Sequence, residues 1–185
     1  MPVKRRSAVL PDLTRYAPLI QKLATELTAK RDFGQPLIDE EVLPRTGLIG
    51  VNVIWDEFVT VPDEDRTAVI QQAYRHANSP DAERLAYAVG YLVPEAVEAG
   101  LLPYVVEPLD TMDGWLTLGD RYKAVRDLGG TTLPRGRRLA ELWCPSIADA
   151  ERCRDELSRR IPGSKDLWRI RHASDRAGRT AGSPR

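Results

Sequence analysis

The segment from Val51 to Ala77 carries two different hydrophobic periods in immediate succession. It begins VNVIWD, where β-branched and aromatic residues alternate with period two, as is typical of a β-strand. Pro62 interrupts that pattern because it has no backbone N–H to donate to a sheet. Three acids follow, which favour a helix N-terminus, and then apolar residues at helical spacing. The segment therefore predicts a strand, a turn and an amphipathic helix.

Hydrophobic period and breaker residues predict the other elements. The pair Ser146 and Asp149 indicates a helix start, and Pro103 suggests that 101–106 is an edge strand because proline cannot donate to a neighbouring strand. The predicted fold class is α+β, with small mixed sheets covered by amphipathic helices. Predicted strands are 48–57, 84–89, 138–144 and 167–171, and predicted helices are 17–30, 64–77 and 147–160. The predicted core includes Ile20, Leu23, Val53, Trp55, Val69, Ile70 and Ala73.

A length of 185 residues allows one domain with an appendage, or two small units. Composition and breaker residues predict four parts. A flexible N-terminus, 1–10, precedes an α/β unit over 11–110, and a smaller α/β unit with a β-α-β segment follows over 111–172. Residues 173–185 are mainly Ala, Ser, Gly, Arg and Pro, which cannot bury a core, so this part is predicted to be a disordered tail.

Asp56-Glu57-Phe58 ends the predicted strand, Arg66 follows eight residues after the phenylalanine, and apolar residues follow Arg66. This pattern resembles the BolA family. The resemblance covers roughly residues 11–100 and implies a BolA/KH-like N-terminal unit.

Three features depart from the pattern of this family. Arg66-Thr67-Ala68 stands where the family has an Arg-His-Arg-like triplet. Thr60 stands where the family usually has glycine, and Arg84 stands where a histidine commonly opens the third strand and ligates an iron–sulfur cluster with a glutaredoxin partner. Arginine is permanently charged and has no lone pair to offer a metal. The metal-sharing role is therefore not expected here.

The net charge is zero, but the charge is unevenly distributed. Residues 1–110 contain 11 Lys/Arg and 17 Asp/Glu, whereas residues 111–185 contain 16 and 10. Such halves can attract each other, within one chain or between subunits. Alternatively, the basic half binds nucleic acid through phosphate contacts, with affinity that falls as salt rises. The candidate nucleic-acid-binding residues are Arg135, Arg137, Arg138, Arg169 and Arg171.

Side chains that could act in catalysis or bind a metal are few and scattered along the sequence. The two cysteines, Cys144 and Cys153, lack the spacing of a zinc site. Cys153 belongs to a helical apolar stripe, whereas Cys144 ends a strand beside Pro145 and is a candidate exposed thiol. The acidic run Asp39-Glu40-Glu41 is placed in a loop bounded by prolines. No catalytic, cofactor-binding or metal-ligating residues are expected.

Location and function follow from these observations as expectations. No apolar run approaches the ~20 residues of a membrane helix, no segment resembles a signal peptide, and two cysteines are too few for a disulfide scaffold, so a cytoplasmic location is expected. The leading hypothesis is a non-enzymatic α/β interaction module that acts through a protein partner or by self-association. The alternatives are a nucleic-acid-associated protein that uses the basic C-terminal half, and an enzyme whose site is dispersed in sequence.

Overall fold

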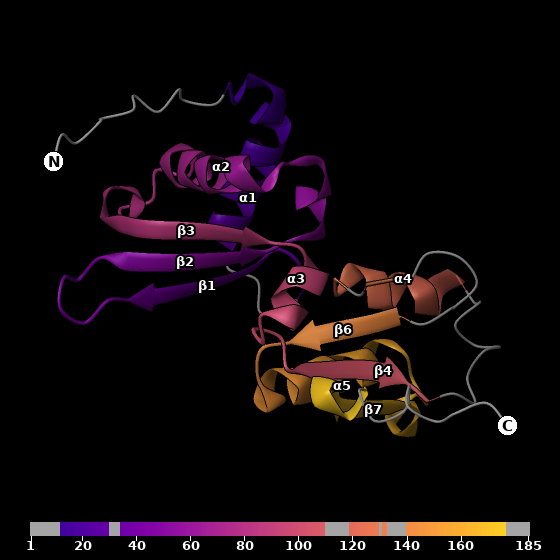
Figure 1. Ribbon diagram of the computed structural model, residues 1–185. Helices are drawn as coiled ribbons and strands as arrows, with labels where there is room; N and C mark the ends of the chain where they lie inside the picture. Colours follow the sequence, from indigo (N-terminus) through magenta and orange to yellow (C-terminus); the bar gives the residue numbers. More distant parts are fainter. Residues whose placement is uncertain (1–11, 30–33, 110–118, 130, 133–139, 177–185) are drawn as a thin grey trace, which may run out of the picture. The chain divides into compact units, whose positions relative to one another are not determined.

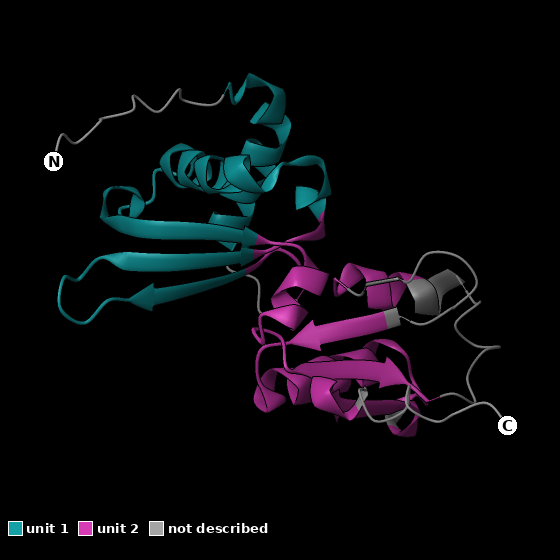
Figure 2. Ribbon diagram, in the orientation of Figure 1, with its two compact units in different colours: residues 1–30, 38–53, 57–90 teal, residues 31–37, 54–56, 91–185 magenta. Residues whose placement is uncertain are grey.

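A computed structural model describes residues 12–29, 34–109, 119–129, 131–132 and 140–176. These residues form two compact units, which Figure 2 shows in different colours. Unit 1 comprises residues 1–30, 38–53 and 57–90, and unit 2 comprises residues 31–37, 54–56 and 91–185. Each unit is built from strands and helices, so the predicted α+β class is confirmed.

Unit 1 is a three-stranded sheet with helices packed against it (Figure 1). The sheet has the order β1-β2-β3, with β1 and β2 joined by a tight turn and β3 following α2. The elements are η1 (Thr14–Tyr16), α1 (Ala17–Ala29), β1 (Leu37–Val42), β2 (Ile49–Ile54), η2 (Asp56–Thr60), α2 (Asp63–His76), η3 (Ala82–Arg84) and β3 (Leu85–Tyr91).

The core of unit 1 lies around β2, the central strand. Val51 and Val53 are fully buried, as are Val69 and Ile70 of α2, which is why the sequence of this strand is apolar at almost every position. Arg66 is also buried, and its guanidinium donates hydrogen bonds to the carbonyl oxygens of Val61 and Gly90. Each of the seven residues predicted for the core is buried: Ile20, Leu23, Val53, Trp55, Val69, Ile70 and Ala73.

Unit 2 contains a four-stranded antiparallel sheet with the order β5-β6-β4-β7. The order of elements along the chain, β-α-β-β-α-β, together with this strand order is the split β-α-β arrangement called ferredoxin-like. The elements are α3 (Val93–Glu98), β4 (Tyr104–Pro108), α4 (Gly119–Asp127), β5 (Thr131–Thr132), β6 (Ala140–Cys144), α5 (Ile147–Arg160), η5 (Lys165–Leu167), β7 (Trp168–His172) and η6 (Ala173–Arg176).

Helix α5 and the sheet of unit 2 share a hydrophobic core. The apolar stripe of α5, with Ala150, Cys153 and Leu157, packs with Val106 of β4 and Leu142 of β6. A second cluster joins Ile54 and Leu102 to α3. The observed helix α5 has the bounds predicted for it, 147–160, and the predicted β-α-β segment corresponds to β6, α5 and β7.

The structure corrects two strand predictions. The segment predicted as an edge strand is β4, which pairs with β6 on one side and β7 on the other. Pro103 does not prevent this because it lies just before the strand. The acidic run Asp39-Glu40-Glu41, predicted to be a loop, lies within β1.

Both predicted chain ends reach beyond the described residues. The predicted flexible segment 1–10 lies outside them altogether. The predicted tail begins with the short helix η6, and its residues 177–185 are not among those described. The predicted boundary between the α/β units, at 110, stays a prediction.

Candidate functional site

Two of the five candidate nucleic-acid-binding arginines lie on β7 beside Glu107 of β4. The strand register pairs Glu107 with Arg169 and Val105 with Arg171, which places both arginines on the same face of the sheet as the carboxylate. Arg169 Nε donates to Glu107 Oε1 at 2.7 Å. Arg171 donates from Nε to the same oxygen at 3.0 Å and from Nη2 to Oε2 at 2.9 Å. This is a forked arginine–carboxylate pair with a second arginine attached.

The electrostatics of this cluster favour ionised partners. Burial by itself raises the pKa of Glu107, but the hydrogen bonds from Arg171 and Arg169 outweigh it, so its pKa lies below the ordinary value. The bond to Glu107 likewise raises the pKa of Arg171. Both arginines are thus engaged with a carboxylate of their own sheet. The other three candidates, Arg135, Arg137 and Arg138, lie outside the described residues.

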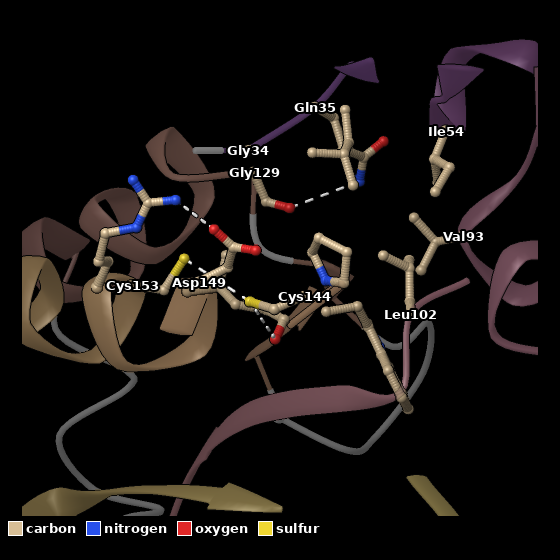
Figure 3. A pocket seen from close by; sticks show the side chains of 14 residues that line it. Gly34, Gln35, Ile54, Val93, Leu102, Gly129, Cys144, Asp149 and Cys153 are labelled. Atoms are coloured by element: carbon tan, nitrogen blue, oxygen red, sulfur yellow. Dashed lines mark hydrogen bonds and ion pairs between the residues drawn. The ribbon is translucent and has the colours of Figure 1, made fainter. Parts of the chain in front are cut away.

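A pocket of about 230 Å³ lies within unit 2, at the point where β6 leads into α5 (Figure 3). Two walls meet there, one from the segment 34–37 and the other from the strand end and first turns of the helix. Its lining includes Gly34, Gln35, Ile54, Val93, Leu102, Gly129, Trp143, Cys144, Pro145, Asp149, Arg152 and Cys153.

The helix side of the pocket is fixed by the N-cap of α5. Ser146 Oγ accepts a hydrogen bond from Asp149 N at 3.1 Å and donates one to Asp149 Oδ2 at 2.5 Å. Arg152 also bonds to the Asp149 carboxylate. Burial raises the pKa of Asp149, but the bonds from Ser146 and Arg152 outweigh that effect and leave it below the ordinary value. The carboxylate is therefore charged and already partnered.

The pocket wall opposite α5 is shaped by two glycines and held in place by one glutamine. Gly34 and Gly129 both have positive φ angles, and a Cβ on Gly129 would lie 2.4 Å from Gly34 Cα. Gln35 Nε2 donates to Asp56 Oδ2 at 2.9 Å, and Gln35 Oε1 accepts from Asp56 N at 2.6 Å. These contacts hold the segment 34–37 in place within unit 2.

Cys144 and Cys153 face each other at the pocket, with 3.7 Å between their sulfur atoms (Figure 3). Cys144 is 3 % exposed and Cys153 is 5 % exposed. The expectation of an exposed thiol at Cys144 is therefore wrong, because the end of β6 is covered by α5, whereas the core position expected for Cys153 is confirmed. The thiol of Cys144 donates toward Cys153, which lowers the pKa of Cys153, and the same bond together with burial raises the pKa of Cys144.

Sequence reasoning missed this pair because it compared the cysteines only with metal-site spacings. The cap at Ser146 indicates that a helix starts directly after the strand, but it does not indicate which helix position meets the strand end.

Strand β1 is a second candidate site, in unit 1. It is the terminal strand in the order β1-β2-β3, and the side chains of Asp39, Glu40, Glu41 and Val42 are exposed. Glu40 accepts a hydrogen bond from the hydroxyl of Tyr74. Burial and that carboxylate raise the pKa of Tyr74, so the hydroxyl remains a donor.

No known protein family, curated protein or solved structure matches this chain. Among the described residues, no group of three or more His, Cys, Asp or Glu side chains is placed to hold a metal ion. None of the described helices is both long and apolar enough to span a bilayer.

Proposed function

We propose that this protein is a non-enzymatic interaction module, and that unit 1 binds a basic, extended segment of a partner protein along β1. The observation that supports this proposal is the position of β1 at the end of its sheet, where its outer backbone edge has no neighbouring strand within the described part of the chain. An exposed edge of this kind can add one more strand, with main-chain hydrogen bonds supplying affinity.

Charge indicates the chemistry of the partner. Three consecutive acids, Asp39, Glu40 and Glu41, lie on the exposed edge strand. The described residues of unit 1 contain eleven Asp/Glu and six Lys/Arg. Like charges placed opposite each other destabilise a strand pair, so two copies of β1 would repel. A segment rich in Lys or Arg would instead find opposite charges on β1.

The hairpin also offers apolar surface. Val42, at the end of β1, is 58 % exposed, and Leu48, which precedes β2, is also exposed. These residues lie at the two ends of the same tight turn, where Leu43 N donates to Leu48 O. A partner strand with basic and β-branched residues would therefore match both features.

The test uses a fluorescent peptide of alternating lysine and valine. We expect its anisotropy to rise with wild-type protein and not with the double variant Asp39→Lys, Glu41→Lys. The matched control is Glu64→Lys, Glu83→Lys, which makes the same change in net charge at exposed positions elsewhere in unit 1 and should retain binding.

Three results would overturn the proposal. One is no binding of the peptide by the wild type, and another is equal loss of binding in the two double variants, which would indicate attraction to net charge alone. The third is binding of a labelled oligonucleotide, but not of the peptide, by both wild type and the β1 variant, which would favour the nucleic-acid alternative.

A further inference from the structure

The two cysteines of the chain meet although they come from different elements. Cys144 is the last residue of β6, and Cys153 lies in the second turn of α5. Their sulfur atoms are 3.7 Å apart, which is ordinary van der Waals contact. A disulfide requires ~2.05 Å between the sulfurs, so bond formation needs an approach of about 1.7 Å. Closing this distance requires rotation of the two side chains together with a small shift of the helix.

Both thiols also line the same pocket, which gives a small reagent access to them. The pocket volume is about 230 Å³, whereas a single water molecule needs only ~10–15 Å³ on the same measure. Hydrogen peroxide is only slightly larger than water. The low exposure of the two cysteines therefore excludes large reagents better than it excludes peroxide.

The two sulfurs share a hydrogen bond in which the thiol of Cys144 donates toward Cys153, and this bond favours a thiolate at Cys153. Burial and the carboxylate of Asp149 oppose a thiolate at either sulfur, whereas Arg152 favours one at either sulfur. The contact between the two cysteines, rather than a neighbouring charge, therefore makes one sulfur the donor and the other the acceptor. A reactive thiolate beside a second thiol is the arrangement of redox-sensing cysteines.

We propose that Cys144 and Cys153 form a reversible intramolecular disulfide when the protein meets hydrogen peroxide. The thiolate of Cys153 attacks one peroxide oxygen, the O–O bond breaks, and hydroxide leaves and takes up a proton as water. The thiol of Cys144 then attacks the sulfenic acid at Cys153, the S–O bond breaks, and a second water leaves. In sum, two thiols and one peroxide give one disulfide and two waters.

This proposal does not depend on a metal or on unit 1. A metal-binding role for the pair lacks further ligands, since no cluster of three ligating side chains occurs among the described residues. The competing explanation is that the two sulfurs merely fill the core beneath α5, as part of the cluster with Leu142 and Leu157. In that case the folded protein would keep both thiols when peroxide is added.

The experiment treats the folded, full-length protein with hydrogen peroxide and measures its intact mass without reductant. We expect the wild type to lose the mass of two hydrogen atoms as a monomer, with a peptide cross-link between Cys144 and Cys153, and to regain both on treatment with dithiothreitol. Because these are the only two cysteines in the chain, the assignment is unambiguous.

Single variants separate the two steps. In Cys144→Ser, the sulfenic acid at Cys153 has no thiol partner, so the intact mass should gain one or more oxygen atoms instead of losing two hydrogen atoms, whereas Cys153→Ser should gain much less. The proposal would be overturned if the folded wild type kept both thiols free, gave only intermolecular dimers, or formed sulfinic acid without an internal disulfide. The wild-type measurement stands even if a serine variant fails to fold.

Discussion

At the scale of single residues, Glu107 lies on β4, one of the two inner strands of the sheet in unit 2, and bonds to Arg169 and Arg171 of the neighbouring strand β7. Its carboxylate is almost fully buried and accepts three hydrogen bonds from Arg169 and Arg171. Removing charges from water is costly, and here the cost is offset by forked geometry and by two cations for one anion. Glu107 thus engages both guanidinium groups, and the nucleic-acid contacts predicted for Arg169 and Arg171 stay a prediction.

Replacing Glu107 by glutamine tests this interpretation. The variant Glu107→Gln leaves two partly buried guanidinium groups without their anion, and we expect a loss of about 3 kcal/mol in the free energy of unfolding. This loss is at the low end of the range for breaking a buried ion pair because the Arg169 side chain is 33 % exposed. Urea denaturation at neutral pH measures it. Glu156→Gln is the control, since its partner Arg159 is solvent-exposed, and it should change stability far less.

The same carboxylate predicts a dependence on acid. The pKa of Glu107 is lowered in the folded chain, so its stabilisation is fully present above the unfolded value of ~4.3 and is lost as pH falls through the folded pKa. The stability difference between wild type and Glu107→Gln should therefore shrink as pH falls below about 4. A difference that stays constant down to the acid transition would contradict the ion-pair account.

At the scale of elements, the sequence predicts those helices and strands whose capping residues and hydrophobic period lie within the element itself. Helix α5 has a cap at Ser146 and a clear apolar stripe, and α2 has an acidic first turn, so both were predicted closely. Strand β1 escaped prediction because LIDEEV is exposed along most of its length and is held by pairing with β2 rather than by its own pattern. The central position of β4 depends on strands that lie far along the chain.

In the candidate site, too, features set by neighbouring residues could be predicted, and contacts between distant segments could not. The core role of Cys153 follows from helical spacing, which is visible in the sequence. Its contact with Cys144 depends on the angle at which α5 returns over β6, and no residue pattern states that angle. The pairing of Arg169 and Arg171 with Glu107 depends on the register between β4 and β7, more than sixty residues apart.

The central strand of unit 1 supports a prediction on packing. Val53 is fully buried, so Val53→Asp places an unpaired charge in the core and should lower the free energy of unfolding by roughly 3–5 kcal/mol. Val59→Asp, at a position that is 73 % exposed in η2, is the matched control and should be nearly neutral. Thermal melting of the two variants distinguishes them. Equal melting temperatures would show that β2 is not the core strand.

The cap of α5 supports a smaller effect. Ser146→Ala removes the oxygen that accepts from Asp149 N and should cost about 1 kcal/mol in unfolding free energy. The control is Ser158→Ala in the same helix, because Ser158 Oγ donates to Arg154 O and caps nothing. Chemical denaturation measures both variants. A larger loss at Ser158 than at Ser146 would contradict the capping role.

At the scale of the whole molecule, neither unit is a continuous piece of chain. Residues 31–37 and 54–56 belong to unit 2, although unit 1 surrounds them in sequence. The cluster around α3 takes Ile54 from the second of these segments, with Leu37 of the first packed against it. The cluster beneath α5, by contrast, consists entirely of residues after 105. The two clusters of unit 2 therefore depend differently on the N-terminal half.

A fragment of residues 91–185 tests this difference. The cluster beneath α5 is complete in the fragment, so β4 and α5 should keep their protection from amide hydrogen exchange. Helix α3 should lose protection, because Ile54 is missing from its cluster. Ile54→Ala in the full-length chain is the control and should weaken protection in α3 more than in α5. Full protection of α3 in the fragment would contradict the assignment.

The interleaving of the two units also limits how the gene can be rearranged. Each unit draws on three separate stretches of the coding sequence. A single recombination break anywhere between the first strand of unit 1 and the last strand of unit 2 leaves at least one of them incomplete. Neither unit is therefore a continuous cassette that a single break could move whole.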